Sequence, residues 1–486
     1  MTDTSDEGVQ ALLKNLKAAL ALSDRGAINR VVAALLALNA PLGQQWASLA
    51  QLMTHNGELA LARDAMAAFV RAQGQAAAAS FQHAVLLATI GDYAEAKRTV
   101  SIIPAGFPSP ETRAHFEGVV AMNLGDFSAA RENFQVALRH HPIAGPTWLS
   151  LVALGNMAAD PIANQLLAVA PNAGRQPPSE YAQFLFAVGK VHADRNDHAA
   201  AYGAFANAAA VMATLRRHDL AADDRGAALS IAGFDPPPFK PADAGQDMAS
   251  TRPIFVLGNP RSGSTLVETI LTSHSAVIDG AELNRFKLVA LSLGGPGAAR
   301  LTEYRRRAGT LKPLAADYLH LASERFGASG RFVDKTLNHS RMLGLIAAIL
   351  PAAPLVWVRR DPLDCAWSCF RTYFAQGADW SHSQTNIAAH FRLEDQLLDF
   401  WTAVLGERLL IVPYEELVND PTSWTKRLLS HCGLPAESTT CAPHEQSRVA
   451  STSSIMQVRE PINRKGIGVA EPYRKFMQPF IAAYYD

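Results

Sequence analysis

Cysteine is scarce in this sequence, and the cysteines that are present form no recognisable set. There are four among 486 residues, at Cys365, Cys369, Cys432 and Cys441. They include no C-x-x-C pair and match no metal-ligand spacing, so we predict no metal site. Cys365 and Cys369 are four residues apart on a predicted helix, and we expect them to pack rather than to bond. This cysteine usage fits a reducing cytoplasm.

An excess of either charge is also missing. Lysine plus arginine number 44, and aspartate plus glutamate number 44, so the formal net charge is zero. Because no basic field is present, we do not predict nucleic acid as a main partner.

Long apolar runs are absent as well, although hydrophobic residues make up 49% of the chain. No run approaches the roughly 18 residues that a membrane span needs. The first ten residues, MTDTSDEGVQ, are acidic and lack the apolar stretch of a secretory signal. We therefore predict a cytoplasmic protein, with a length that allows two to four domains.

A period of 34 residues is present in the first part of the chain. Gly57, Gly91 and Gly125 are 34 residues apart. An alanine follows each glycine by five residues, and a small residue precedes each by seven: Ala62, Ala96, Ala130, Ala50, Ala84 and Gly118. This spacing resembles the tetratricopeptide repeat, in which small residues let paired helices approach closely.

The period continues to about residue 230. A fourth copy is centred on Asn196, and residues 147–171 are interpreted as a degenerate repeat. We predict an all-α tetratricopeptide superhelix over residues 1–232. Such arrays form a groove that commonly holds an extended peptide or a partner protein. The alternative is a scaffold that only forms a homodimer or stabilises the rest of the chain.

Residues 233–252 are predicted to join this array to a second domain, residues 253–486. The joint contains the proline cluster Phe-Asp-Pro-Pro-Pro-Phe-Lys-Pro, which cannot continue a helix and favours an extended, stiff connection.

The second domain opens with PIFVLGNPRSGSTL, residues 253–266. The pattern predicts a buried strand, a glycine- and proline-marked loop, and a helix from about Ser264. Backbone N–H groups at such a helix N-terminus form an anion site. The frame resembles a Walker A loop, but Ser264 stands where the lysine would be, and Arg261 lies earlier in the loop. The group that reaches a γ-phosphate in ATP and GTP enzymes is therefore missing.

The form PRSGSTL resembles the 5′-phosphosulfate loop of sulfotransferases that use 3′-phosphoadenosine 5′-phosphosulfate (PAPS). The usual form of that loop is P-[RK]-[SA]-G-[ST]-T-[LW]. The resemblance implies that the donor is bound by Arg261, Ser262, Gly263, Ser264 and Thr265. The alternative is a strand–turn–helix corner without a ligand.

A second phosphate motif follows about 100 residues later. A predicted strand runs into Arg360-Asp361-Pro362, and the next helix carries Ser368. In the same family the 3′-phosphate site has an arginine at a strand end and a serine eight residues on, and Arg360 and Ser368 keep this spacing. Eight residues place the hydroxyl about two helical turns along, near the same phosphate. Asp361 is expected to cap the helix.

Two further strand ends carry candidate catalytic residues. Glu282 follows Gly-Ala after a predicted strand, at the place where tyrosylprotein sulfotransferases carry the base that takes the acceptor's proton. Lys335 ends another predicted strand and matches the family lysine near the transferred sulfate, where it would neutralise the leaving phosphate. The alternatives are a carboxylate at a helix start for Glu282 and a surface ion pair between Lys335 and Asp334.

The C-terminal part agrees with the family in two places and departs from it in one. Tyr414 ends a predicted strand in a Y-E-x-L motif that lies near the nucleotide in the family. Ser454 matches a donor-contacting serine in the loop S-x-x-Q-V-[RK]-x-P. Val469 stands where a basic residue normally closes over the 3′-phosphate. The candidate replacements are Arg464, Lys465 and Arg474.

Together these motifs predict an all-α superhelix followed by an α/β sulfotransferase domain, P-loop-like, with a mainly parallel sheet and helices on both faces. The resemblance implies sulfuryl transfer from PAPS to an acceptor hydroxyl, giving PAP, without a metal. Arg261 and Lys335 would stabilise charge, Ser454 would assist, and Glu282 would be the base.

The Gly-Ala-Glu motif and the repeats favour tyrosine in a protein or peptide as the acceptor. The alternatives are a small-molecule or carbohydrate hydroxyl, a degenerate P-loop nucleotide kinase or NTPase, and a binding scaffold with an inactive enzyme domain.

Overall fold

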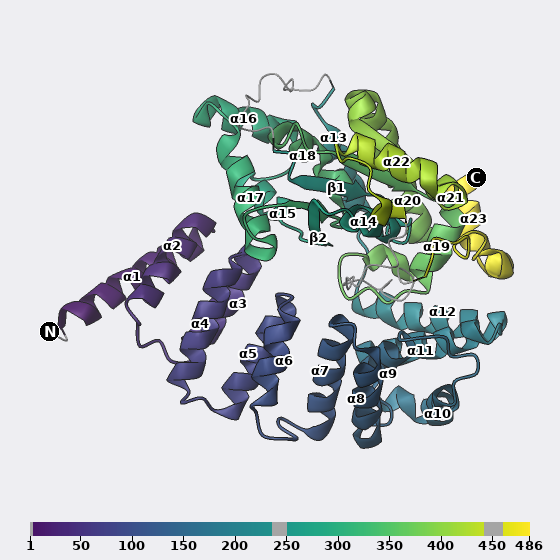
Figure 1. The fold of residues 1–486 in the computed structure, drawn as a ribbon, viewed down its shortest axis with the longest axis horizontal. Helices are drawn as coiled ribbons and strands as arrows, with labels where there is room; N and C mark the ends of the chain where they lie inside the picture. The colour runs from purple at the N-terminus through teal and green to yellow at the C-terminus, as the bar shows by residue number, and fades with distance from the viewer. Residues whose placement is uncertain (1–2, 236–249, 442–459) are drawn as a thin grey trace. The chain divides into compact units, whose positions relative to one another are not determined.

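The computed structural model describes residues 3–235, 250–441 and 460–486. The chain divides into two compact units. Unit 1 contains Met1–His140 and Tyr318–Ala328, and unit 2 contains His141–Asp317 and Ser329–Asp486. Figure 1 labels their elements in chain order. Within the described ranges, no helix is both long enough and apolar enough to cross a membrane.

Unit 1 is built from helices that pair with their neighbours in sequence (Figure 1). They are α1 (Asp3–Ala21), α2 (Arg25–Ala37), α3 (Gln45–Asn56), α4 (Leu59–Ala72), α5 (Ala77–Thr89), α6 (Tyr93–Ser101), α7 (Pro110–Asn123) and α8 (Phe127–His140). The glycines of the 34-residue period lie in the turns between paired helices. Gly57, Gly91 and Gly125 have φ values of 81°, 85° and 80°, a region that only glycine adopts without strain.

Small residues lie where the paired helices touch. A Cβ atom on Gly118 would lie 2.5 Å from the ring of Phe134, and in unit 2 a Cβ atom on Gly189 would lie 2.5 Å from Phe205. The alanines in phase with the glycines have no exposed surface: Ala62, Ala96 and Ala130. The predicted period therefore corresponds to packed helix pairs, and the tetratricopeptide assignment stays a prediction.

Unit 2 begins with helices as well. They are α9 (Gly145–Val152), α10 (Ile162–Val169), α11 (Pro178–Asp194), α12 (His198–Leu215) and α13 (Leu220–Ile231). The first two have 8 residues each and lie in the region that the sequence analysis interprets as a degenerate repeat, an interpretation that stays a prediction. Asn196 takes the place of the turn glycine with a φ of 61°, which asparagine tolerates better than most residues.

The last of these helices share a core with the α/β part of unit 2. Tyr202 of α12 stacks on Phe476 at 4.7 Å, and Phe205 meets Trp367 edge-on at 5.8 Å. Trp367 belongs to α19 (Pro362–Phe370) and is fully buried. The predicted joint, residues 233–252, falls inside unit 2, and its residues 236–249 lie outside the described chain. The predicted domain boundaries themselves stay a prediction.

The α/β part is built on one parallel sheet. Its strands are β1 (Pro253–Leu257), β2 (Val277–Ala281), β3 (Arg331–Asp334), β4 (Leu355–Arg359) and β5 (Leu409–Pro413), in the order β2-β3-β1-β4-β5. Ile254 pairs with Val333 of β3, and Val256 pairs with Val356 of β4. All five residues of β1 are buried, as in a sheet that is covered on both faces.

Helices cover both faces of this sheet. Ile254 and Val256 pack with α14 (Ser264–Thr272) and α22 (Pro421–His431). Phe255 points to the other face and meets Phe286 of α15 (Phe286–Leu293) at 5.6 Å. The remaining α-helices of unit 2 are α16 (Ala298–Ala308), α18 (Leu343–Ile349), α20 (Gln384–Leu405), α21 (Tyr414–Asn419) and α23 (Gln478–Tyr485), whereas α17 (Lys312–Phe326) begins in unit 2 and ends in unit 1. The predicted fold class, an all-α region followed by an α/β domain, is confirmed.

The topology explains why two distant motifs meet. Strands β1 and β4 are parallel neighbours, so the segments that follow them lie at the same edge of the sheet. The phosphate-loop-like segment follows β1, and Arg360 follows β4.

Candidate functional site

The loop between β1 and α14 is shaped by two residues in the left-handed region. Arg261 has a φ of 70°, and Gly263, the N-cap of α14, has a φ of 103°. A Cβ atom on Gly263 would lie 2.4 Å from the ring of Tyr414. Glycine at this position therefore allows both the turn and the close approach of the tyrosine.

A cavity of about 300 Å³ adjoins the N-terminus of α14. Seven of the eight predicted donor-binding residues line it: Arg261, Gly263, Ser264, Thr265, Arg360, Ser368 and Tyr414. Ser264 and Thr265 begin α14, whose first N–H groups are available to an anion. The structure thus brings the two predicted phosphate motifs to one cavity.

The side chain of Ser262 lies elsewhere. It is 2% exposed, and it lines a second cavity of about 20 Å³, which has room for about one water molecule. Its backbone N–H donates to Asn259 O at 3.1 Å. A direct donor contact from Ser262 stays a prediction.

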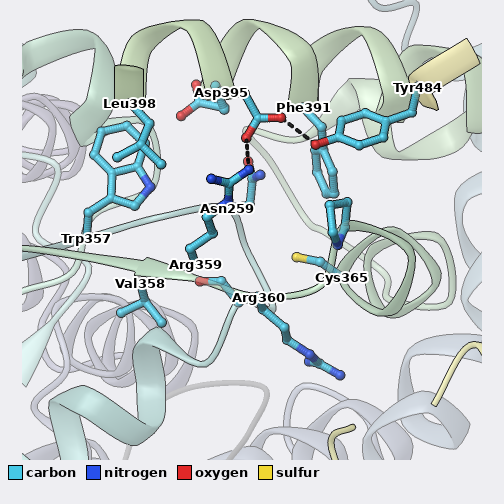
Figure 2. Close-up of a pocket in the computed structure, with 13 residues that line it drawn as sticks. Asn259, Trp357, Val358, Arg359, Arg360, Cys365, Phe391, Asp395, Leu398 and Tyr484 are labelled. Atoms are coloured by element: carbon cyan, nitrogen blue, oxygen red, sulfur yellow. Dashed lines mark hydrogen bonds and ion pairs between the residues drawn. The ribbon is translucent and has the colours of Figure 1, made fainter. Parts of the chain in front are cut away.

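Figure 2 shows this smaller cavity and the end of β4. Arg359 lies 3.5 Å from Asp395, which also accepts a hydrogen bond from Tyr484 of α23. Arg360 points away from Asp395 in Figure 2, as expected because consecutive strand residues face opposite sides. Arg360 lines both cavities, and the end of its side chain points away from Asp395.

Arg360 holds the walls of the larger cavity together. Its Nη1 donates to Arg261 O at 2.8 Å, and its Nη2 donates to Gly466 O. The guanidinium also lies over the ring of Tyr414, 4.9 Å from its centroid. The guanidinium carries five N–H groups, and within the described residues its Nε–H makes no hydrogen bond while each Nη donates one, so further N–H groups can meet an anion.

Helix α19 follows Arg360 and carries the next two contributors. Asp361 caps it as predicted, since its Oδ1 accepts from Asp364 N at 2.9 Å. The carboxylate of Asp364 accepts from Gly468 N and Ala470 N at 2.7 and 2.9 Å. Asp364 therefore fixes the 466–470 segment beside the cavity, and Ser368 lies one turn further along.

Arg371 is a cavity residue that the sequence analysis missed. It ends α19, lines the cavity, and makes no guanidinium hydrogen bond within the described chain. Burial lowers the pKa of Arg371 to about 10, and nearby Arg261 lowers it further in the same direction. Burial also lowers the pKa of Arg261. Three guanidiniums thus line one cavity, an arrangement suited to a ligand with several negative charges.

The next question is which residue replaces the basic residue that the family carries at the position of Val469. Val469 lines the cavity, but Arg464 does not. Lys465 lines it too, yet this lysine is exposed and pairs with Glu460 at 2.6 Å. Arg474 pairs with Glu471 on the surface. Ser454, the predicted assisting residue, lies outside the described residues.

Lys335 and Glu282 meet in a second cluster. Lys335 is 5% exposed, and its Nζ donates to Glu282 Oε1 at 2.9 Å. Its Nζ also lies 3.7 Å from Glu268 Oε2. Burial acts to lower the pKa of Lys335, but the two carboxylates outweigh it and the pKa is raised. The surface pair with Asp334 is wrong, because Asp334 is buried and accepts from Thr336 Oγ1 at 2.6 Å.

Glu282 directly follows β2, as predicted. Helix α15 begins only at Phe286, so Glu282 does not cap that helix. Its side chain is 44% exposed and open to an incoming group. The cluster does not line the 300 Å³ cavity, but helix α14 connects them, since Thr265 lines the cavity and Glu268 lies one turn later.

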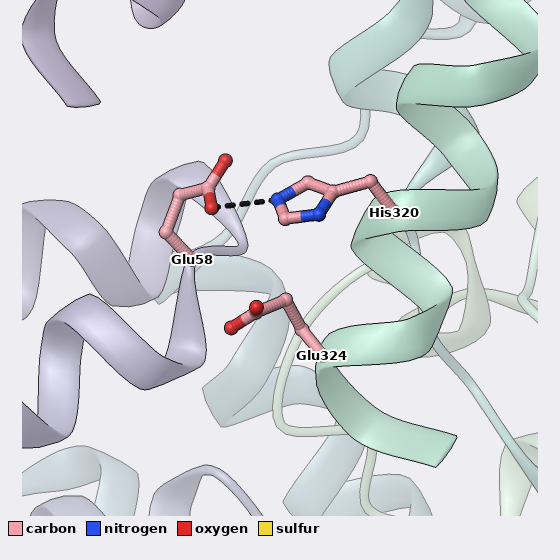
Figure 3. Close-up of side chains that lie close together, drawn as sticks. All are labelled: Glu58, His320 and Glu324. Atoms are coloured by element: carbon pink, nitrogen blue, oxygen red, sulfur yellow. Dashed lines mark hydrogen bonds and ion pairs between the residues drawn. The ribbon is translucent and has the colours of Figure 1, made fainter. Parts of the chain in front are cut away.

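Unit 1 contains a third group of titratable side chains, shown in Figure 3. Potential ligand atoms of Glu58, His320 and Glu324 lie within 4.8 Å of one another. Glu58 Oε2 is bonded to His320 Nε2 at 2.8 Å, and Glu324 Oε2 accepts from Ala60 N at 2.7 Å. Asn29 Nδ2 donates to Glu58 Oε1 at 2.7 Å. These bonds tie the segment 318–328 to the start of α4, and the absence of a metal stays a prediction.

Comparison with known proteins gives two kinds of similarity in sequence. A family model described as "Sulfotransferase family" matches residues 253–438. A curated relative from Aquifex aeolicus (strain VF5), described as an uncharacterized protein, is 31% identical over 254 residues. The match covers 49% of this chain and 33% of the relative, so the chain spans about a third of the length of the curated relative it matches.

Solved structures show weaker similarity. The sulfotransferase domain of the Synechococcus PCC 7002 olefin synthase is 19% identical with a TM-score of 0.33, covering 46% of this chain and 94% of that chain. Sulfotransferase STF9 from Mycobacterium avium is 15% identical with a TM-score of 0.29, covering 65% of this chain and 96% of that chain. At these scores the likeness carries no information about the site.

The family match begins at Pro253, the first residue of β1, and ends at Ser438, the first residue of the 3-10 helix η7 (Ser438–Cys441). It therefore includes the phosphate-loop-like segment, the Glu282–Lys335 cluster and the α19 motif. Residues 253–438 of this chain therefore match the sulfotransferase family model.

Proposed function

We propose that this protein transfers a sulfuryl group from PAPS to an acceptor hydroxyl. The observation that carries the proposal is the 300 Å³ cavity, which combines a helix N-terminus with three guanidiniums and has no Walker-type lysine. Sites with these features bind phosphate groups through backbone N–H groups and arginine forks.

The cavity residues fit a ligand with two separate anionic ends. The N-terminus of α14, with Ser264 and Thr265, would hold the 5′-phosphosulfate. Arg360, Ser368 and Arg371 would hold the 3′-phosphate, and Arg371 would supply the positive charge that Val469 lacks. The volume of about 300 Å³ lies at the lower end of the range for small-molecule sites.

The reaction needs a base on the acceptor side and positive charge on the donor side. Bound PAPS would supply the sulfuryl group, whose bond to the 5′-phosphate oxygen breaks with its electron pair as the acceptor oxygen bonds to sulfur. Glu282 would take the acceptor's proton on its carboxylate. Arg261 and Lys335 would stabilise the charge that develops on the transferred group and the departing phosphate.

The acceptor that we propose is a tyrosine of a protein or peptide. A phenol proton has a pKa near 10, so a carboxylate removes it more easily than the proton of an aliphatic alcohol. The paired helices of the N-terminal region, which resemble peptide-holding repeats, add support.

A comparison of KM tests the role of the repeats. A long tyrosine-containing polypeptide should have a far lower KM than N-acetyltyrosine amide at similar kcat, and equal KM values would contradict peptide holding.

Ligand-induced thermal shifts test the donor. PAP and PAPS without magnesium should stabilise the protein, by about 2.7 kcal/mol at a hundredfold excess over the dissociation constant. ATP and GTP with magnesium should have much smaller effects, because the lysine that reaches a γ-phosphate is missing. A preference for ATP-magnesium over PAP would instead favour a nucleotide kinase or NTPase.

A further inference from the structure

Glu268 is a buried carboxylate to which the proposed reaction gives no role. It lies on α14, one turn after Thr265, and only 5% of its surface is exposed. Its Oε2 is buried and accepts no hydrogen bond within the described chain, and the ammonium of Lys335 lies 3.7 Å from it. Buried carboxylates without hydrogen bonds are costly, so this one calls for a reason.

The space for this carboxylate is kept open by Gly280 of β2. A Cβ atom on Gly280 would lie 2.4 Å from Glu268 Oε1 and 2.8 Å from its Cγ. Any other residue at this position would displace the carboxylate. The glycine of the Gly-Ala-Glu motif therefore serves Glu268, while the glutamate of the same motif binds Lys335.

The charged groups that face Glu268 are Lys335, Glu282 and Asp279. Burial raises the pKa of Glu268 to about 7; Lys335 opposes this rise, and the two other carboxylates add to it. One ammonium is thus shared between two carboxylates. Lys335 donates to Glu282 at 2.9 Å, and Glu268 is the second, more distant acceptor at 3.7 Å.

This arrangement conflicts with the role of Glu282 unless the ammonium can move. A carboxylate that accepts a hydrogen bond from an ammonium is a weaker base, because the bond favours its charged form. The ammonium of Lys335 is buried, so when it leaves Glu282 it needs a carboxylate beside it in addition to the negative charge that develops on the transferred group. Glu268 Oε2 lies within reach and has no competing bond in the described chain.

We propose that Glu268 is a positioning residue that accepts the ammonium of Lys335 when Glu282 turns to the acceptor hydroxyl. The inference rests on the proposed sulfuryl transfer, because it assigns Glu268 a part in making Glu282 available as the base.

The test is Glu268→Gln in the full chain, with Glu394→Gln as a matched control. Glu394 is 6% exposed, accepts a hydrogen bond from Ser340, pairs with Arg341, and is not among the charged groups that face Glu268. Three quantities are measured from pH 5 to pH 9: melting temperature, PAP affinity, and PAPS turnover with water or 2-naphthol as acceptor.

Glu268→Gln should lower turnover at pH 8 by about tenfold, because the ammonium then stays on Glu282 and weakens it as a base. PAP affinity should stay within about twofold, since Glu268 does not line the donor cavity. Wild-type turnover should rise as the pH passes through about 7, where Glu268 ionises, and the variant should lack this rise.

The melting temperatures give a readout that does not depend on turnover. Because the pKa of Glu268 is raised from 4.5 in the folded state, the wild type loses stability as the pH rises from 4.5 through about 7. Glu268→Gln should melt near the wild type at pH 5 and above it at pH 8. Glu394→Gln should melt lower throughout and keep the wild-type pH profile of turnover.

The outcomes separate the two proposals. If PAP binds but Glu268→Gln keeps both the turnover and the pH profile of the wild type, Glu268 has only a structural role. If PAP does not stabilise the wild type, the proposed function itself fails. Gly280→Ala gives a second approach, because displacing the carboxylate should also remove the turnover rise near pH 7 while leaving PAP affinity unchanged.

Discussion

The donor cavity and the Glu268–Lys335–Glu282 cluster differ in how their charged side chains are arranged. The cavity gathers Arg261, Arg360 and Arg371, all of one sign, with burial lowering the pKa of two of them. The cluster alternates signs, with Lys335 between two carboxylates. Guanidiniums stay protonated near neutral pH, whereas the pKa of Glu268 is about 7.

These two arrangements of charge suit different kinds of chemistry. Fixed like charges repel one another until an anion is bound, so the cavity is suited to holding a polyanion and not to exchanging protons. A shared ammonium with two carboxylates can be redistributed at little cost, so the cluster is suited to proton transfer. Helix α14 serves both, with its first residues at the cavity and Glu268 at the cluster.

The largest effect is expected from Glu282→Gln. Glutamine keeps the size of glutamate but cannot accept a proton at neutral pH, so the transfer rate should fall by about 10²–10⁴. PAP affinity should hardly change, because Glu282 does not line the cavity. A phenol acceptor should lose less rate than an aliphatic alcohol. Turnover and PAP thermal shifts on the same preparation measure both quantities.

A near-normal rate for Glu282→Gln would show that Glu282 is not the base. The nearby histidines, His274 and His339, could not act as the base instead, because both are buried in the structure. His274 is 1% exposed, its Nδ1 accepts from Ala276 N, and its Nε2 bonds to Pro435 O. His339 is 2% exposed, and burial lowers its pKa. Such a result would therefore contradict the division of labour between the two regions.

The next largest effect separates two arginines of the cavity. Arg371→Leu should weaken PAP binding by about 30-fold, the loss of one charge-assisted hydrogen bond of roughly 2 kcal/mol. The stability of the ligand-free protein should not fall, because Arg371 has no hydrogen-bond partner in the described chain and its charge is opposed by Arg261.

Arg360→Leu is the comparison for Arg371→Leu. It should weaken PAP binding and also lower the melting temperature, because Arg261 O and Gly466 O lose their donor. PAP titration and thermal unfolding of both variants measure the contrast. Equal loss of stability in both variants would mean that Arg371 also holds the cavity together.

Most of the α/β framework could be predicted from the sequence. The apolar runs before Gly258, Arg360 and Tyr414 are long enough and bounded clearly enough to read as buried strands, and all three are strands in the structure. The 34-residue period likewise predicted the helix pairs, because turn glycines and small contact residues recur together.

The charge partners could not be predicted in the same way. An arginine at the end of a helix is common, so the sequence around Arg371 does not by itself indicate a cavity residue. Its spacing of three from Ser368, which places both residues on one helical face, is the signal that could have identified it. Glu268 has no basic residue within four positions, which hints at a partner elsewhere. The partner, Lys335, is brought beside α14 only by the pairing of β2 with β3 and of β3 with β1.

Ionic strength should affect the donor cavity more than the Glu268–Lys335–Glu282 cluster, and this effect should be smaller than those of the substitutions above. Raising the salt concentration from 50 to 500 mM should weaken PAP binding by about tenfold, because the cavity attracts the ligand partly through solvent-accessible charge. The turnover rise near pH 7 should move little, since Glu268 and Lys335 are each 5% exposed and screened much less by salt. A shift of both quantities by the same factor would contradict this separation.

The smallest effect is expected from Lys465→Ala, which tests whether Lys465 or Arg371 replaces the basic residue missing at Val469. Lys465 lines the cavity, but 74% of its side chain is exposed and its ammonium is 2.6 Å from Glu460. Exposed ion pairs contribute about 0–1 kcal/mol, so PAP affinity should change by less than about fivefold and the melting temperature by less than about 2 °C. Isothermal titration with PAP, run beside Arg371→Leu, measures the ranking. A larger loss of affinity for Lys465→Ala than for Arg371→Leu would mean that Lys465 leaves Glu460 to bind the 3′-phosphate. In that case Lys465, and not Arg371 at the end of α19, would supply the positive charge that is missing at Val469.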